Sequence, residues 1–73
     1  MSATKPERRA AVMVFVRTFR SEHGYGPTYR EIAAALGLGV ATTQSHVRQL
    51  LEAGTLVSEP GKPRTLRPTE ENQ

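Results

Sequence analysis

The sequence has no cysteine, no aspartate and no apolar run of the roughly 18 residues that a membrane-spanning helix needs. Without cysteine, disulfides and thiolate metal sites are excluded, which fits a reducing cytoplasm. His23 and His46 have no carboxylates at ligand spacing around them, so no metal is predicted. Arginines bracket the apolar stretch 10–16, so we predict neither a signal peptide nor a membrane association. No cofactor or small-molecule ligand is indicated.

Positive charge exceeds negative charge along the body of the chain. Ten Lys and Arg stand against seven Glu in 73 residues, for a net charge of +3. Two of the glutamates lie in the last four residues, which leaves ten positive against five negative charges before them, a net +5. Such a body suits a polyanionic partner. An enzyme is not predicted, because the sequence has no nucleophile with a base and orienter, no phosphate loop and no acidic cluster.

Residues 6–22 are predicted to form a first helix. Pro6 suits the first helical position, and Gly24 suits a left-handed cap after the last turn. Apolar residues recur at the i, i+3, i+4 and i+7 spacing of one buried face: Val12, Phe15, Val16 and Phe19. Val14 falls off this face, either as a lone exposed residue or as a contact for a partner. The arginines of this segment are expected on a solvated face: Arg8, Arg9, Arg17 and Arg20.

The stretch 28–53 has the pattern of two short helices joined by a tight turn. Thr28 and Glu31 form a capping box, and Gly37 stops the second helix. Leu38 is expected to be the buried residue of the turn. The third helix runs from residue 39 or 40 to about 53, with Thr43, Val47 and Leu50 facing inward. This is the layout of a helix-turn-helix.

Two β-prone runs follow the third helix, at residues 55–59 and 64–67, with turn-forming residues between them. They predict a hairpin whose Leu56 and Leu66 contact the core. Three positive charges lie on or beside its tip, as in a wing that reaches phosphates or the minor groove: Lys62, Arg64 and Arg67. The predicted fold is therefore mainly α with a small β-hairpin, a three-helix winged helix-turn-helix over residues 6–68. Residues 1–5 and 69–73 are expected to be a disordered arm and a disordered tail.

The run Gly24 to Ile32, GYGPTYREI, resembles the stretch before and through the second helix of the LexA repressor's N-terminal DNA-binding domain. That family has a G-(aromatic or Met)-x-P-(T or S)-x-x-E-I pattern there. The segments 36–38 and 46–50 also fit, and the resemblance covers about residues 4–68. It implies a winged helix-turn-helix fold, DNA binding and a repressor-like role.

The chain departs from this family at two places. The interval from Gly37 to His46 is one residue shorter, and the Ser-x-(Asn or Ser) element that opens the family's recognition helix is replaced by residues 39–43, GVATT. The family's operator sequence therefore does not transfer. The family's self-cleaving domain, with its Ser and Lys pair, has no counterpart in these residues, so self-cleavage is not expected.

The sequence therefore predicts a sequence-specific double-stranded DNA-binding protein, a repressor-like transcriptional regulator. The third helix enters the major groove, the start of the second helix meets the backbone, and the hairpin clamps the flanking groove. A single small module needs a second copy, for example in a homodimer, for strong specificity. The predicted DNA contacts follow these three elements in turn: Val40, Ala41, Thr42, Gln44, Ser45, Arg48 and Gln49; Thr28, Tyr29 and Arg30; and Lys62, Arg64 and Arg67.

Two other functions remain open from the sequence. Small winged-helix proteins can bend DNA during recombination, so an architectural or recombination-accessory role is an alternative. A protein-binding winged helix is the other alternative, with Val14 and the third helix as its contact surface. A protein-binding module would have no need of a basic wing.

Overall fold

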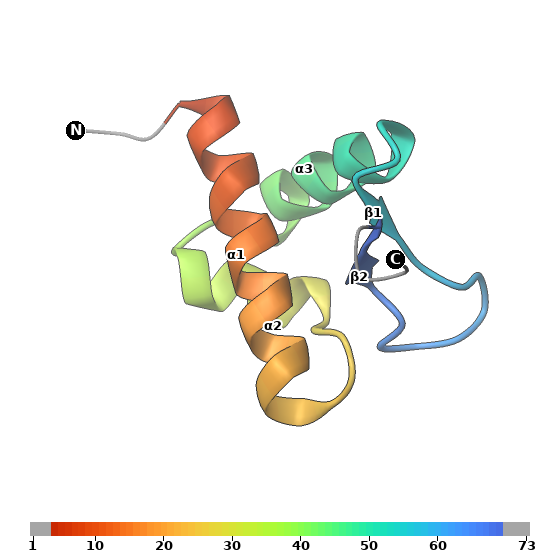
Figure 1. Cartoon of the computed structure of the whole chain (residues 1–73). Helices are drawn as coiled ribbons and strands as arrows, with labels where there is room; N and C mark the ends of the chain where they lie inside the picture. Colours follow the sequence, from red (N-terminus) through yellow and green to blue (C-terminus); the bar gives the residue numbers. More distant parts are fainter. Residues whose placement is uncertain (1–3, 70–73) are drawn as a thin grey trace.

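The computed structural model describes residues 4–69, which form three helices followed by a small antiparallel hairpin (Figure 1). In chain order these are α1 (Lys5–His23), α2 (Tyr29–Leu36), α3 (Val40–Glu52), β1 (Leu56–Val57) and β2 (Arg67–Pro68). The predicted mainly helical, winged helix-turn-helix architecture is confirmed. Among residues 4–69, no helix combines the length and the apolar character that a membrane crossing requires.

The ordered region begins earlier than expected, because Thr4 and Glu7 form a capping box. Thr4 Oγ1 accepts from the Glu7 N–H at 3.3 Å, and the Glu7 carboxylate accepts from Thr4 in return. Helix α1 therefore starts at Lys5 with Thr4 as its cap, inside the segment 1–5 that was expected to be a disordered arm. At the other end, Thr69 donates to the Gly54 carbonyl. Residues 1–3 and 70–73 lie outside the described part of the chain.

The core lies where α1, α2, α3 and the hairpin meet (Figure 1). Its buried apolar side chains come from all four elements: Val12, Met13, Val16, Ile32, Ala33, Val47, Leu50, Leu56 and Leu66. The predicted inward faces are thus largely confirmed, with the addition of Met13. Leu38 is half-buried rather than buried, and the half-buried Leu36 packs against the core at that end of α2. Phe19 lies outside the core and packs against Tyr25.

The hairpin is held by two residue pairs, Leu56 with Pro68 and Val57 with Arg67. The second strand therefore lies later than the predicted 64–67. Arg64 has a left-handed backbone, with φ 60°, and its carbonyl accepts from the Gly26 N–H at 2.9 Å. Its backbone thus faces the loop between α1 and α2 instead of β1, which prevents strand pairing there.

Gly26 is the point at which the α1–α2 loop touches the hairpin backbone. A Cβ on Gly26 would overlap the Leu66 carbonyl and lie 2.9 Å from the Leu66 nitrogen. Since both neighbours are backbone atoms, neither can move aside alone. The close approach therefore requires glycine for its size.

His46 is a polar residue within the core, 5% exposed. Neither ring nitrogen has a hydrogen-bond partner among residues 4–69, and Thr43 Oγ1, one turn earlier on α3, is in the same condition. Burial lowers the pKa of His46 below its ordinary 6.5, and the positive charges of nearby arginines and Lys5 lower it further. The imidazole is therefore neutral in the folded protein at neutral pH.

Gly26→Ala should destabilise the fold by about 1–3 kcal/mol, because the added methyl group forces the hairpin away from the loop. Denaturant unfolding measures this loss. Gly39→Ser is the control: Gly39 has a negative φ, nothing within 4 Å of an added Cβ, and no side-chain cap for α3. A serine there should raise the stability by a few tenths of a kcal/mol. Equal stability of Gly26→Ala and the parent chain would contradict the close approach.

The free energy of unfolding should fall as the pH is lowered through 6.5, the ordinary pKa of histidine. The unfolded chain then binds a proton at His46 that the folded chain resists, so protonation favours unfolding. Unfolding curves between about pH 7.5 and about pH 5.5 measure the slope. His46→Gln should flatten it, whereas His23→Gln, at an exposed site, should retain it. A slope unchanged by His46→Gln would show that another group carries the dependence.

Candidate nucleic-acid interface

Helix α3 exposes a face of small and hydrogen-bonding side chains opposite its core face. Ala41, Thr42, Gln44 and Arg48 are exposed, and Ser45 and Gln49 are half-buried. Val40 is also exposed. Among the described residues, Arg48 has no hydrogen-bond or ion-pair partner, so its five donors are available to a ligand. This face is therefore shaped for a close approach, with one long cationic side chain near its centre.

The start of α2 is organised by its capping box. Thr28 Oγ1 accepts from the Glu31 N–H at 3.1 Å, and the Glu31 carboxylate accepts from the Thr28 N–H at 2.8 Å. Thr28 is half-buried and its hydroxyl accepts this cap bond, so its first role is structural. Tyr29 and Arg30 are exposed beside it. They are the predicted contacts at this helix start whose side chains remain accessible.

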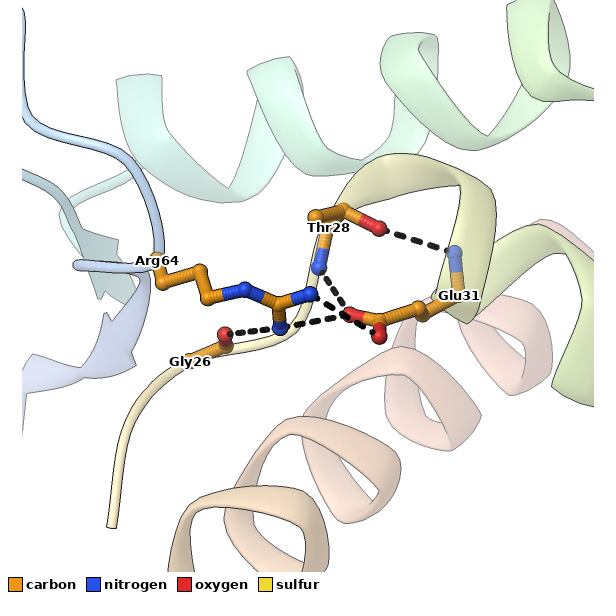
Figure 2. Close-up of polar contacts among 4 residues, drawn as sticks. All are labelled: Gly26, Thr28, Glu31 and Arg64. Carbon is orange, nitrogen blue, oxygen red and sulfur yellow. Dashed lines mark hydrogen bonds and ion pairs between the residues drawn. The ribbon is translucent and has the colours of Figure 1, made fainter. Parts of the chain in front are cut away.

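Arg64 fastens the hairpin to the start of α2 (Figure 2). Its guanidinium makes two bonds to the Glu31 carboxylate, at 2.9 and 3.2 Å, and lies 3.5 Å from the Gly26 carbonyl. The same guanidinium lies 5.0 Å from the centre of the Tyr25 ring. We call this set the clasp: Tyr25, Gly26, Glu31 and Arg64.

The clasp changes the role expected for Arg64. Its charge is offset by Glu31, and the Arg64 guanidinium lowers the pKa of the Glu31 carboxyl below its ordinary 4.5, with the Thr28 N–H adding to the effect. Glu31 raises the pKa of Arg64 in return. Arg64 is therefore not a free cation of the wing. Its side chain is paired with Glu31 and positions the wing.

The other two wing cations differ from each other. Lys62 is exposed and forms an i, i+3 ion pair with Glu59 at 3.7 Å, a kind of pair that contributes little. Arg67 is half-buried in β2, at the base of the hairpin and away from its tip. Thr65 closes the loop by accepting from the Glu59 N–H at 2.8 Å.

One hollow brings the wing and the start of α2 together. Thr28 and Tyr29 line one side of it, and Lys62 and Arg64 line the other. Arg30 and Arg67 are not part of this hollow. The structure thus joins four of the predicted contacts at one site, and the α3 residues form a separate surface.

Glu31 and Tyr25 are the residues of this interface that the sequence reasoning missed. Glu31 was assigned only to the capping box, although a carboxylate can serve a cap and an arginine at once. Arg64 lies 33 positions away in the chain, so no local spacing links the two. The run GYGPTYREI contained all of the clasp except Arg64 and was the available signal.

Comparison with known sequences identifies the family. The profile described as LexA DNA binding domain matches residues 4–65. The chain belongs to the LexA DNA-binding domain family. The resemblance predicted from GYGPTYREI is thereby confirmed, and the match covers all three helices and the first strand.

Several curated relatives are similar to this chain, and each is named LexA repressor. The protein of Limosilactobacillus reuteri (strain DSM 20016) is 37% identical over 70 residues, which are 94% of this chain and 34% of the relative. That of Leuconostoc mesenteroides is 37% identical over 65 residues, 88% of this chain and 31% of the relative. That of Lacticaseibacillus casei (strain BL23) is 45% identical over 49 residues, 66% of this chain and 24% of the relative. The chain spans about a third of the length of the first two of these relatives and about a quarter of the third.

Glu31→Gln should loosen the hairpin while the helices remain folded, because the guanidinium of Arg64 loses its anionic partner. The Gly26 N–H reports this directly, since it donates to the Arg64 carbonyl, and its hydrogen exchange should become several-fold faster. The wild-type chain should show the same loosening in acid. Folding lowers the pKa of Glu31, so the ion pair stabilises the hairpin while Glu31 is ionised, and this stabilisation is lost as the pH falls through the pKa of Glu31 in the folded protein.

Lys62→Ala is the matched control, since it removes an exposed ion pair from the same hairpin. The exchange of the Gly26 N–H should not change in that variant. If Lys62→Ala and Glu31→Gln affected this exchange equally, the clasp would not be what holds the hairpin.

Proposed function

We propose that this chain is the sequence-specific, double-stranded DNA-binding part of a transcriptional repressor. Membership of the LexA DNA-binding domain family supports DNA binding, and the name of its relatives supports repression. The observation that carries the proposal for this chain's own residues is the exposed face of α3, with its unpaired Arg48. A repressor must meet DNA in the compartment where transcription takes place, and we propose that this compartment is the cytoplasm.

Helix α3 enters the major groove, which is about 12 Å wide and admits a helix. Ala41 and Ser45 are small, so the helix axis can come close to the base edges. Arg48, one turn beyond Ser45, reaches a guanine through two hydrogen bonds, the commonest specific contact of arginine with DNA. Gln44 and Gln49 flank this line and can each offer a donor and an acceptor to a base.

The start of α2 and the hairpin meet the sugar–phosphate backbone. The free N–H groups at the start of α2 favour a phosphate, and Tyr29 and Arg30 stand exposed beside them. Lys62 and Arg67 extend the positive surface along the hairpin, while Arg64 fixes the direction of the hairpin through Glu31. These contacts set the register of α3 without reading bases.

Two copies of the domain are needed for strong specificity, because one small module buries only a small interface. A homodimer on a two-fold symmetric site is the arrangement that we propose. The half-sites would then lie about one helical turn of DNA apart or a multiple of it.

Selection of bound duplexes from a random-sequence pool tests this function. We expect a consensus with two related half-sites. Affinity for the selected duplex should fall steeply with salt, as phosphate contacts release counterions. No consensus with retained, salt-dependent binding would favour an architectural role, and absence of duplex binding would favour a protein-binding module.

Arg48→Ala should cost about 1–3 kcal/mol on the selected duplex and relax the preference at one base pair, if Arg48 reads a base. A scrambled duplex of equal length is the comparison, and its affinity should change little. An equal loss on both duplexes would show that Arg48 contacts phosphate, and no loss on either would remove it from the interface.

A further inference from the structure

A groove lies between the beginning of α1 and the exposed side of α3. Lys5 and Arg8 of α1 line one wall, and Thr42, Ser45 and Gln49 of α3 line the other, with His46 in the floor. None of the residues that line the groove is acidic. Arg8, expected on a solvated face, is half-buried and lines this groove.

The positive charge in the groove has no ion-pair partner in the part of the chain that the structure describes. Lys5 and Arg8 form no ion pair or side-chain hydrogen bond with any of residues 4–69. Arg9 lies on the next position of α1, and its Nε is buried without a partner. Burial lowers the pKa of His46, and the charges of Arg9, Arg8 and Lys5 lower it further, so these cations act on one region.

Unsatisfied hydrogen-bond donors point to the same region. Gly39 precedes α3 and has no side chain to cap it, so the first N–H groups of α3 lack a side-chain acceptor. This end of the helix dipole is also positive. His46, in the lining of the groove, is 5% exposed, and neither of its ring nitrogens has a partner in the described chain; one of the two is a donor in the neutral imidazole. The groove therefore combines cations, hydroxyl groups and the free N–H groups at the start of α3, and no residue in its lining is negatively charged.

The groove adjoins the face of α3 that the proposed function assigns to the bases. At about 100° per residue, Thr42 and Gln49 lie on the flank of the strip formed by Ala41, Ser45 and Arg48. When that strip faces base edges, the flank faces one of the two backbones that border the major groove. Lys5 and Arg8 stand across the groove from this flank.

We infer that this groove binds a backbone phosphate of the DNA, held between Lys5 and Arg8 of α1 and the start of α3. The inference rests on the proposed DNA binding and adds α1 to the elements that contact DNA. The phosphate supplies the negative charge that the groove lacks. It anchors the backbone on the flank of α3 that the wing does not reach.

Arg8→Ala tests the site, with Arg17→Ala as the matched control. Arg17 is an exposed residue of the same helix nine positions away, which places it on the opposite side of α1 from Arg8. Both variants lose one positive charge. On a short random-sequence duplex, Arg8→Ala should weaken binding several-fold and make the salt dependence shallower by about one unit, and Arg17→Ala should change neither.

A direct contact is separated from a general charge effect by duplexes in which single phosphates are replaced by neutral methylphosphonates. One replacement should weaken binding of the wild-type chain and cause no further loss in Arg8→Ala. Thermal unfolding checks that Arg8→Ala is folded. If it is not, Lys5→Ala, at an exposed site, replaces it, and its binding should likewise be insensitive to the methylphosphonate replacement. If the wild-type chain binds duplex DNA and Arg8→Ala and Arg17→Ala lose equal affinity, the groove site is overturned and the proposed function is not. Absence of wild-type binding to any duplex would overturn the proposed function instead.

Discussion

The bidentate ion pair between Arg64 and Glu31 is the constraint on which the placement of the hairpin depends. Two residue pairs are too few to stabilise a hairpin in water, so the helices must hold it. Leu56 and Leu66 provide apolar contact with the core, but apolar contact has no preferred direction. Arg64 provides the direction, and its left-handed backbone, which costs about 1–2 kcal/mol at a residue other than glycine, is compensated by the contacts that it makes.

The same clasp gives a physical reason for the composition of the run GYGPTYREI. Gly26 allows the backbone of residue 66 to approach, and Tyr25 lies against the guanidinium of Arg64. Glu31 Oε1 accepts from both the Thr28 N–H and the Arg64 guanidinium, and Oε2 accepts a second bond from Arg64 (Figure 2). The segment that carries the resemblance to the LexA family is therefore the part that joins the wing to the helix-turn-helix.

Features that depend on residues close together in the chain could be predicted from the sequence, and features that depend on contacts between distant residues could not. The capping box at Thr28, the left-handed Gly24 and the inward face of α3 depend on spacings within one element, and the structure confirms them. The pairing of Glu31 with Arg64 and the later start of β2 depend on how the hairpin meets the α1–α2 loop. The burial of His46 could not be predicted for a related reason. It arises from the packing of α1 over α3, and a periodic pattern of apolar residues does not mark a histidine as buried.

The clasp also decides where positive charge remains for a partner. On the hairpin, Glu31 offsets Arg64 and Glu59 lies near Lys62, so the attraction of this element for phosphate is less than its count of cations indicates. Among residues 4–69, the cationic side chains that have no ion-pair or hydrogen-bond partner lie on the helices: Lys5, Arg8, Arg9, Arg30 and Arg48. A hairpin that is held firmly needs less charge of its own, because its position is already fixed before DNA arrives. The clasp therefore fixes the orientation of the wing, and most of the positive charge without a partner among residues 4–69 lies on the helices, including Arg48 on the exposed face of α3.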